Sequence, residues 1–155
     1  MKNLVPYNAV VYTSLTILIS LLGCGSSYRK EQSLVNDNYA RFLSEIGILT
    51  LPSKLIVVPT QGCGPCIKVT MDFLRDTVSS SNIAVVISGP SKKSCSLLMK
   101  KFNVQRKNVV FDLKTSAKGY GITTIYPVLL SYKDNKWHAV DITLENHEKT
   151  LTSQQ

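Results

Sequence analysis

Two cysteines separated by two residues stand where a strand pattern gives way to a helical one. The β-forming run 55–58 leads into Cys63-Gly64-Pro65-Cys66, and apolar residues at helical spacing follow it. A helix N-terminus stabilises an anion, because its backbone N–H groups are unpaired and its dipole is positive there. We therefore expect the Cys63 thiol to ionise readily, with Cys66 one turn further along the helix. The chemistry that this arrangement indicates is thiol–disulfide exchange.

Two other uses of this cysteine pair are open. A structural zinc site needs a second pair of ligands. The remaining candidate ligands show no such spacing; they are Cys24, Cys95, His138 and His147. An inert disulfide across so short a loop would stabilise the fold little. The spacing therefore favours redox chemistry, and we expect neither a metal ion nor another cofactor.

The N-terminal region predicts a signal peptide. Residues 9–22 are apolar apart from scattered Thr and Ser, a length that fits a signal sequence better than a full membrane span. The sequence Leu-Leu-Gly-Cys, which ends at Cys24, follows directly and resembles the bacterial lipobox. This resemblance implies that residues 1–23 are removed and that Cys24 is lipidated. An uncleaved membrane anchor is the alternative.

Both interpretations of the N-terminal region place the domain outside the cytoplasmic membrane of a bacterium. Disulfide chemistry is at home in that compartment. We therefore expect the protein at the extracytoplasmic face of a bacterial membrane, as a periplasmic lipoprotein. Residues 24–35 are small or polar and predict a tether, which leaves residues 36–155 for one folded domain.

The chain is basic, with 18 Lys and Arg, 10 Asp and Glu, and a net charge of +8. Six basic residues cluster in one stretch: Lys92, Lys93, Lys100, Lys101, Arg106 and Lys107. A solvated helix face explains this cluster most simply, and the alternative is an anionic partner such as phospholipid headgroups or an acidic protein. No aromatic interleaving or recognisable module indicates nucleic acid.

The rest of the domain predicts alternating strands and helices. A continuous apolar run, 83–87, is typical of a strand buried on both faces, and it completes a strand–helix–strand unit with parallel pairing. A helix capped by Ser91 would place Cys95 in the core; a role as a third redox cysteine is the alternative. The other expected elements are a helix from Asn36 or Asp37 to Gly47, a strand 54–58, a helix 63–79, a strand 109–111, a polar turn or short helix 112–118, a hairpin 128–143 and a weak helix within 144–155.

This order of elements around the Cys-Gly-Pro-Cys motif resembles thioredoxin, which carries the same Gly-Pro between its cysteines. Tyr120-Gly121-Ile122, followed by Pro127 before an apolar strand, resembles the thioredoxin stretch that runs into its cis-proline. The segment 109–120 and the lipobox are closer to the membrane-anchored TlpA/ResA group. The resemblance covers residues 50–145 and implies an α/β fold. The expected architecture is a thioredoxin-like three-layer α/β/α sandwich with a mixed sheet and a C-terminal β-hairpin.

The resemblance also implies roles for individual residues. Cys63 would be the attacking thiol and Cys66 the resolving one, with Gly64 and Pro65 as the motif between them. Pro127 would follow a cis bond, and the backbone of Tyr126 would face the attacking cysteine and pair with a substrate peptide. An ordinary trans bond is the alternative, since most bonds to proline are trans.

Three departures from the thioredoxin pattern are visible. Gly62 stands where thioredoxins usually have a tryptophan, Val57 replaces a buried acid, and the closing helix is short or absent. That acid helps to deprotonate the resolving cysteine, so water or another group must accept the proton here.

The function that this resemblance implies is a lipid-anchored thiol–disulfide oxidoreductase, acting in the reducing direction. Its partners would be protein disulfides or dithiols and a membrane protein that supplies electrons. The alternative is a non-catalytic lipoprotein that uses the fold as a binding scaffold, with Cys63 and Cys66 as a fixed bridge.

Overall fold

The computed structural model describes residues 36–48, 50, 52–77, 83–105, 108–123 and 125–152. The predicted signal peptide, the tether and the predicted lipidation site at Cys24 lie outside these residues. In the part of the chain that is described, no helix has both the length and the apolar character needed to span a bilayer.

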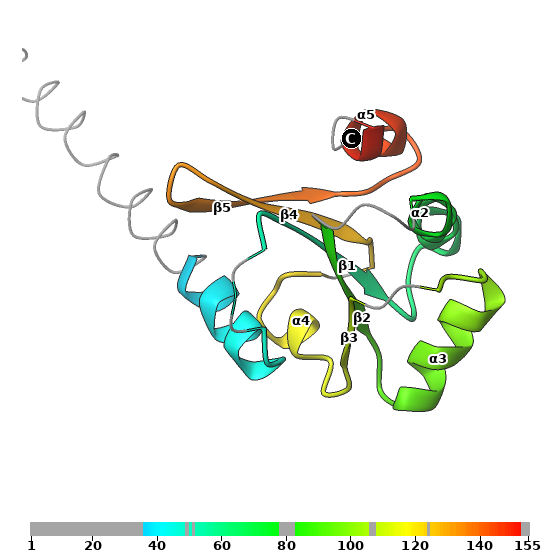
Figure 1. Ribbon diagram of the computed structural model, residues 1–155, viewed down its shortest axis with the longest axis horizontal. Coiled ribbons are helices and arrows are strands. Elements are labelled where there is room, and N and C mark those ends of the chain that lie inside the picture. Colours follow the sequence, from blue (N-terminus) through cyan, green and yellow to red (C-terminus); the bar gives the residue numbers. More distant parts are fainter. Residues whose placement is uncertain are drawn as a thin grey trace, which may run out of the picture. The chain divides into compact units, whose positions relative to one another are not determined.

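A mixed five-stranded sheet forms the centre of the domain, in the order β3-β2-β1-β4-β5 (Figure 1). The strands are β1 (Lys54–Pro59), β2 (Ile83–Ser88), β3 (Val109–Asp112), β4 (Val128–Lys133) and β5 (Lys136–Asp141). The first three strands are parallel, whereas β4 runs antiparallel to both β1 and β5. The predicted strand–helix–strand unit and the C-terminal hairpin are confirmed.

Helices cover both faces of this sheet. One face packs against α2 (Gly64–Asp76), α3 (Lys92–Lys101) and α5 (His147–Thr152), and the other against α4 (Ser116–Gly119) and a helix over residues 36–45. The side chains of β1 alternate between the two apolar clusters, with Ile56 and Val58 in the first and Leu55 and Val57 in the second. The fold is therefore the predicted thioredoxin-like three-layer α/β/α sandwich.

Local signals set most element boundaries. Gly47 has φ +78° and ends the first helix, where its N–H bonds the Ser44 carbonyl and the N–H of Ile48 reaches the Leu43 carbonyl. Ser91 caps α3 through a reciprocal capping box with Ser94.

Local geometry also defines the turn of the β4–β5 hairpin and the C-terminal end of α2. The β4–β5 turn places Asp134 and Asn135 at φ +53° and +58°, the pattern of a type I′ hairpin turn. The prediction that the second helix extends to Ser79 was wrong, because α2 ends at Asp76. The Thr77 backbone N–H and hydroxyl both donate to the Phe73 carbonyl there and cap the last turn.

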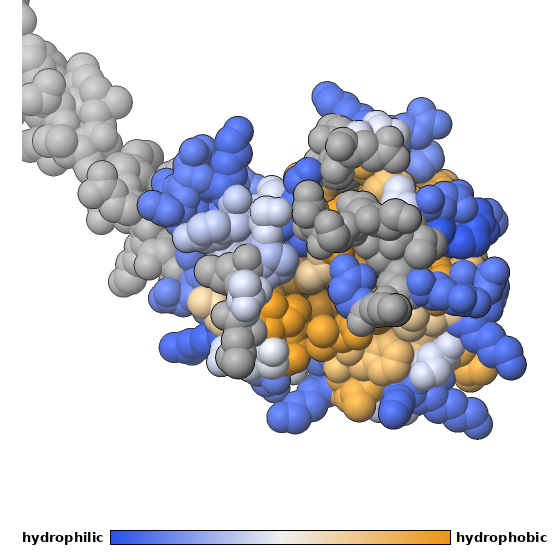
Figure 2. Space-filling view, viewed as in Figure 1, coloured by the Kyte–Doolittle hydropathy of each residue, from blue (hydrophilic) through white to orange (hydrophobic). Residues whose placement is uncertain are grey.

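The outer face of α3 carries four of the six basic residues in the predicted cluster; the other two, Arg106 and Lys107, lie outside the described residues. Lys92, Lys93, Lys100 and Lys101 are all exposed, and none of them forms an ion pair with a described residue. Leu97 lies among them with 55% of its surface exposed. Hydrophilic side chains project along this edge of the molecule, with hydrophobic residues visible between them (Figure 2).

Candidate active site

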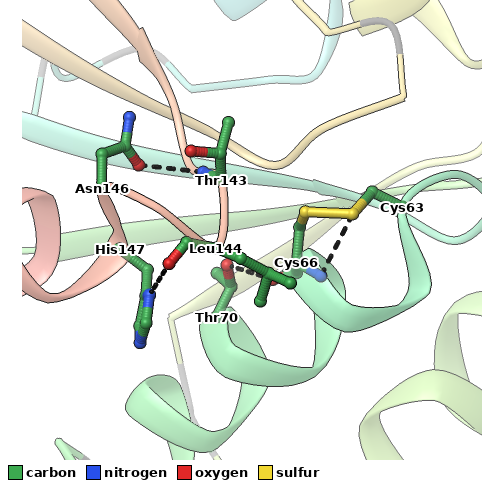
Figure 3. Close-up of a disulfide and its surroundings, with 7 residues drawn as sticks. All are labelled: Cys63, Cys66, Thr70, Thr143, Leu144, Asn146 and His147. Atoms are coloured by element: carbon green, nitrogen blue, oxygen red, sulfur yellow. Dashed lines mark hydrogen bonds between the residues drawn. A yellow bond between two sulfur atoms is a disulfide. The ribbon is translucent and has the colours of Figure 1, made fainter.

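Cys63 and Cys66 are joined by a disulfide at the start of α2 (Figure 3). The two sulfurs are 2.11 Å apart and the two Cα atoms 5.3 Å apart. Cys63 is the N-cap residue, and its Sγ accepts the backbone N–H of Cys66 at 3.3 Å. Cys66 is 2% exposed, whereas Cys63 is only half-buried. An incoming molecule therefore reaches the sulfur of Cys63 first.

The position of this disulfide follows from the elements on either side of it. Strand β1 is central in the sheet and ends at Pro59, after which the Thr60 N–H bonds the Ser88 carbonyl at 2.8 Å. Pro65 lies in the first turn of α2, where a missing N–H costs no hydrogen bond. The helix is held on the sheet by its buried apolar side chains, Ile67, Met71 and Leu74. The predicted strand-to-helix placement of the motif is confirmed.

The backbone carbonyl of Ile125 approaches the motif from a different part of the chain. It accepts the N–H of Cys63 at 2.8 Å and so satisfies a backbone group at the helix N-terminus. Gly62 has φ +149°, and a Cβ atom added there would overlap this carbonyl oxygen. In this backbone conformation position 62 therefore has no room for a tryptophan or any other side chain. The sequence predicted that a backbone group of this segment would face Cys63 but assigned it to Tyr126, one residue further along the chain.

The predicted cis bond before Pro127 was wrong. The Tyr126–Pro127 peptide bond is not cis, in keeping with the general preference for trans. The Tyr126 carbonyl accepts the Thr123 hydroxyl at 2.5 Å, and the Pro127 carbonyl accepts the N–H of Ile142 at 2.7 Å. The backbone group that contacts Cys63 thus belongs to Ile125, one residue before the predicted Tyr126.

The segment between β5 and α5 forms the other side of the site and lies beside Cys66 and Thr70 (Figure 3). It is braced by its own polar groups: the Asn146 side chain accepts the Thr143 N–H at 2.9 Å, and the His147 ring contacts the Leu144 carbonyl at 2.9 Å. The Leu144 side chain is 50% exposed and that of Ile125 is 51% exposed. Each of these two segments therefore carries an exposed apolar residue.

The remaining described cysteine, Cys95, lies in the core. Cys95 is fully buried under α3, and its thiol contacts the Ile87 carbonyl at 3.6 Å. Burial raises the pKa of the Cys95 thiol above its ordinary value. Its place in the core is the one that the helical spacing predicted.

A buried carboxylate, which the sequence had suggested only as part of a polar turn, lies behind the site. Asp112 is 2% exposed, and its oxygens accept the Ser88 hydroxyl at 2.8 Å and the N–H groups of Ser116 and Ala117 at 2.9 Å each. The signal that could have revealed it is an acid at the end of a strand and a few residues before a helical turn, from which its carboxylate can reach the backbone N–H groups of that turn. Asp112 thereby fixes α4 to the ends of β2 and β3.

The other face of α4 is tied to the N-terminal helix. The Ser116 hydroxyl donates to Glu45 at 2.9 Å, and Lys114 lies 3.6 Å from the same carboxylate. The hydrogen bonds from Ser116 and then from Tyr120 lower the pKa of Glu45. Among the residues that are described, no group of three or more His, Cys, Asp or Glu side chains could hold a metal ion.

Comparison with known proteins gives similarities of structure only. No protein-family model matches the chain, and no curated protein matches it. The chain is similar to a secreted Mycobacterium tuberculosis disulfide oxidoreductase homologous to E. coli DsbE, with a TM-score of 0.48 and 8% identity over 67% of this chain and 83% of that one. It is also similar to a Bacteroides vulgatus protein assigned as a thiol-disulfide oxidoreductase, with a TM-score of 0.40 and 19% identity over 64% of this chain and 69% of that one.

Proposed function

We propose that this protein is a thiol–disulfide oxidoreductase whose reacting group is the Cys63–Cys66 couple. The observation that carries the proposal is the unequal exposure of two bonded cysteines at one helix N-terminus. Cys63 is only half-buried, so its thiolate can reach and attack a substrate disulfide. Cys66 is buried one turn further along the helix, where it can complete the exchange.

The proposed reaction runs in two exchange steps. The Cys63 thiolate attacks one sulfur of a substrate disulfide, which forms a mixed disulfide and releases the other substrate sulfur as a thiolate. The Cys66 thiolate then attacks the Cys63 sulfur, which forms the Cys63–Cys66 disulfide and releases the second substrate thiolate. Two electrons pass from the protein to the substrate. Val57 is fully buried among apolar side chains and offers no carboxylate, so water or another group accepts the proton of Cys66.

Within this proposal the protein is a reductant of protein disulfides, held by a lipid on Cys24 at the extracytoplasmic face of a bacterial membrane. A membrane protein would return it to the dithiol form. Support comes from the lipobox resemblance and from the Gly64-Pro65 dipeptide, which is shared with reducing thioredoxins. The backbone of Ile125 and Tyr126 and the apolar side chains beside the disulfide would contact the substrate peptide.

The order of thiol reactivity tests the proposal. In the reduced full-length protein near neutral pH, we expect iodoacetamide to modify Cys63 at least about tenfold faster than Cys66 or Cys95. The reason is that only Cys63 combines a helix N-terminus with exposure, whereas Cys95 is buried and has a raised pKa. Peptide mass mapping at timed intervals measures the order. Modification of all three at one slow rate would contradict the proposal.

The proposed anchor has its own test. Replacement of Cys24 by alanine should abolish incorporation of a fatty-acid label in bacterial cells and leave the precursor uncleaved, because the acceptor sulfur is missing. Gel mobility together with label incorporation measures both effects. Cys95→Ala is the matched control and should retain label. A Cys24→Ala protein that still carries lipid would show that the anchor lies elsewhere.

A further inference from the structure

A polar pocket lies beside the disulfide motif and is not used in the proposed exchange. Its volume is about 190 Å³, and it opens at the carboxyl ends of β1 and β2, the edge where open α/β sheets bind ligands. Six of its lining residues carry hydroxyl, amide or ammonium groups: Thr60, Gln61, Ser88, Thr115, Lys118 and Thr123. The pocket is thus built to receive a polar group of several atoms.

The charge of the pocket is positive. Among the described residues that line it, Lys118 is the one with a charge, and it forms no ion pair with any of the other residues that the structure describes. The buried carboxylate of Asp112 lies behind Ser88, but its oxygens already accept three hydrogen bonds. A ligand with a carboxylate would therefore meet an unpaired cation and no competing acid in the lining.

Two neutral donors strengthen this preference. The Thr60 hydroxyl and the Gln61 amide make no hydrogen bond to another residue in the described ranges, so both remain available to a ligand. The hydroxyls of Ser88 and Thr123 are different, since they already donate to Asp112 and to the Tyr126 carbonyl. Lys118, Thr60 and Gln61 together can donate to both oxygens of a carboxylate.

Two segments of the chain connect the pocket to the reacting cysteine. Gln61 precedes Cys63 by two residues, and Thr123 belongs to the loop whose Ile125 carbonyl accepts the Cys63 N–H at 2.8 Å. We propose that the pocket binds a carboxylate of the disulfide substrate, on the residue or group next to the sulfur that Cys63 attacks. This inference rests on the proposed oxidoreductase function and adds a substrate preference to it.

The test compares disulfide probes of different charge on the reduced full-length protein in detergent. The anionic probe is dithiobis(nitrobenzoate) and the neutral probe is dithiodipyridine; stopped-flow absorbance follows both reactions. Lys118→Gln should slow the reaction with the anionic probe about fivefold, the scale of one exposed ion pair, and leave the neutral probe unchanged. Lys133→Gln, which removes the same charge from the exposed hairpin turn, should change neither rate.

A second arm identifies where the carboxylate comes from. Two peptide disulfides that differ only by Glu or Gln beside the cysteine are compared in the same assay. If the pocket binds acidic side chains of proteins, Lys118→Gln slows the Glu peptide about fivefold and not the Gln peptide. If only the small anionic probe depends on Lys118, the carboxylate belongs to a small-molecule disulfide.

Two other results have separate meanings. Equal slowing of the anionic and neutral probes by Lys118→Gln, or equal effects of Lys118→Gln and Lys133→Gln, would overturn the carboxylate pocket and leave the oxidoreductase function standing. If the neutral probe reacts with the wild-type protein no faster than with an ordinary exposed thiol, the proposed function fails, and the pocket's role fails with it.

Discussion

Replacement of Cys66 by serine should leave substrate proteins covalently bound to Cys63, whereas replacement of Cys63 by serine should leave few or none. The reason is the order of the two exchange steps: loss of the buried Cys66 stops the reaction after capture, and loss of the exposed Cys63 stops it before. Non-reducing electrophoresis of cell extracts, followed by mass spectrometry of the adducts, measures the difference. We expect the adducts of the Cys66→Ser protein to exceed those of the Cys63→Ser protein by at least about tenfold.

The Cys95→Ser change, added to each variant, is the control for this experiment. Because Cys95 is buried, its removal should leave the adduct pattern unchanged. The experiment also distinguishes an oxidoreductase from a binding scaffold, since a fixed bridge would give no adducts in either variant. Equal trapping by both single variants would mean that Cys63 and Cys66 do not have the proposed roles. Loss of adducts when the membrane electron source is removed would support the reducing direction.

Replacement of Gly62 by alanine should lower the free energy of unfolding by about 3 kcal/mol, because the residue has φ +149° and its new Cβ would meet the Ile125 carbonyl. The carbonyl must then move away from the Cys63 N–H, and a hydrogen bond at the motif is lost. Urea unfolding of the oxidised proteins measures the change.

Gly64→Ala is the matched control for this prediction. Gly64 is two residues away, its φ is not positive, and an added Cβ would have no neighbour within 4 Å. Its stability should therefore change by less than about 1 kcal/mol. Similar unfolding midpoints for the Gly62→Ala and Gly64→Ala proteins would show that the close approach of Ile125 does not constrain the site.

The elements that the sequence predicted well are those with local signals. Each of these elements could be predicted from residues that are adjacent in the sequence. They are the continuous apolar run of β2, the Ser91 cap of α3 and the proline in the first turn of α2. The helical spacing of apolar residues was enough to predict that Cys95 is buried and that Cys63 lies at a helix N-terminus. The parallel pairing of β1 with β2 followed from the strand–helix–strand order of the sequence.

The parts of the site that the sequence did not predict depend on contacts between distant segments. The Ile125 carbonyl reaches Cys63 across 62 positions of the chain, and Asp112 binds Ser88 across 24. No short pattern contains both members of either pair. The bond before Pro127 was mispredicted for a related reason: the only support for a cis bond was the family pattern, and the local sequence allows both isomers.

We expect the amide hydrogens of β1 and of Cys63 to exchange with solvent by different routes. Strand β1 is paired with β2 and β4 and is buried from Leu55 onward, so its amide hydrogens should exchange only when the whole domain unfolds. The Cys63 amide has a single partner, the Ile125 carbonyl in an exposed loop. Its exchange rate therefore records how often that loop leaves the motif while the sheet beneath it stays intact.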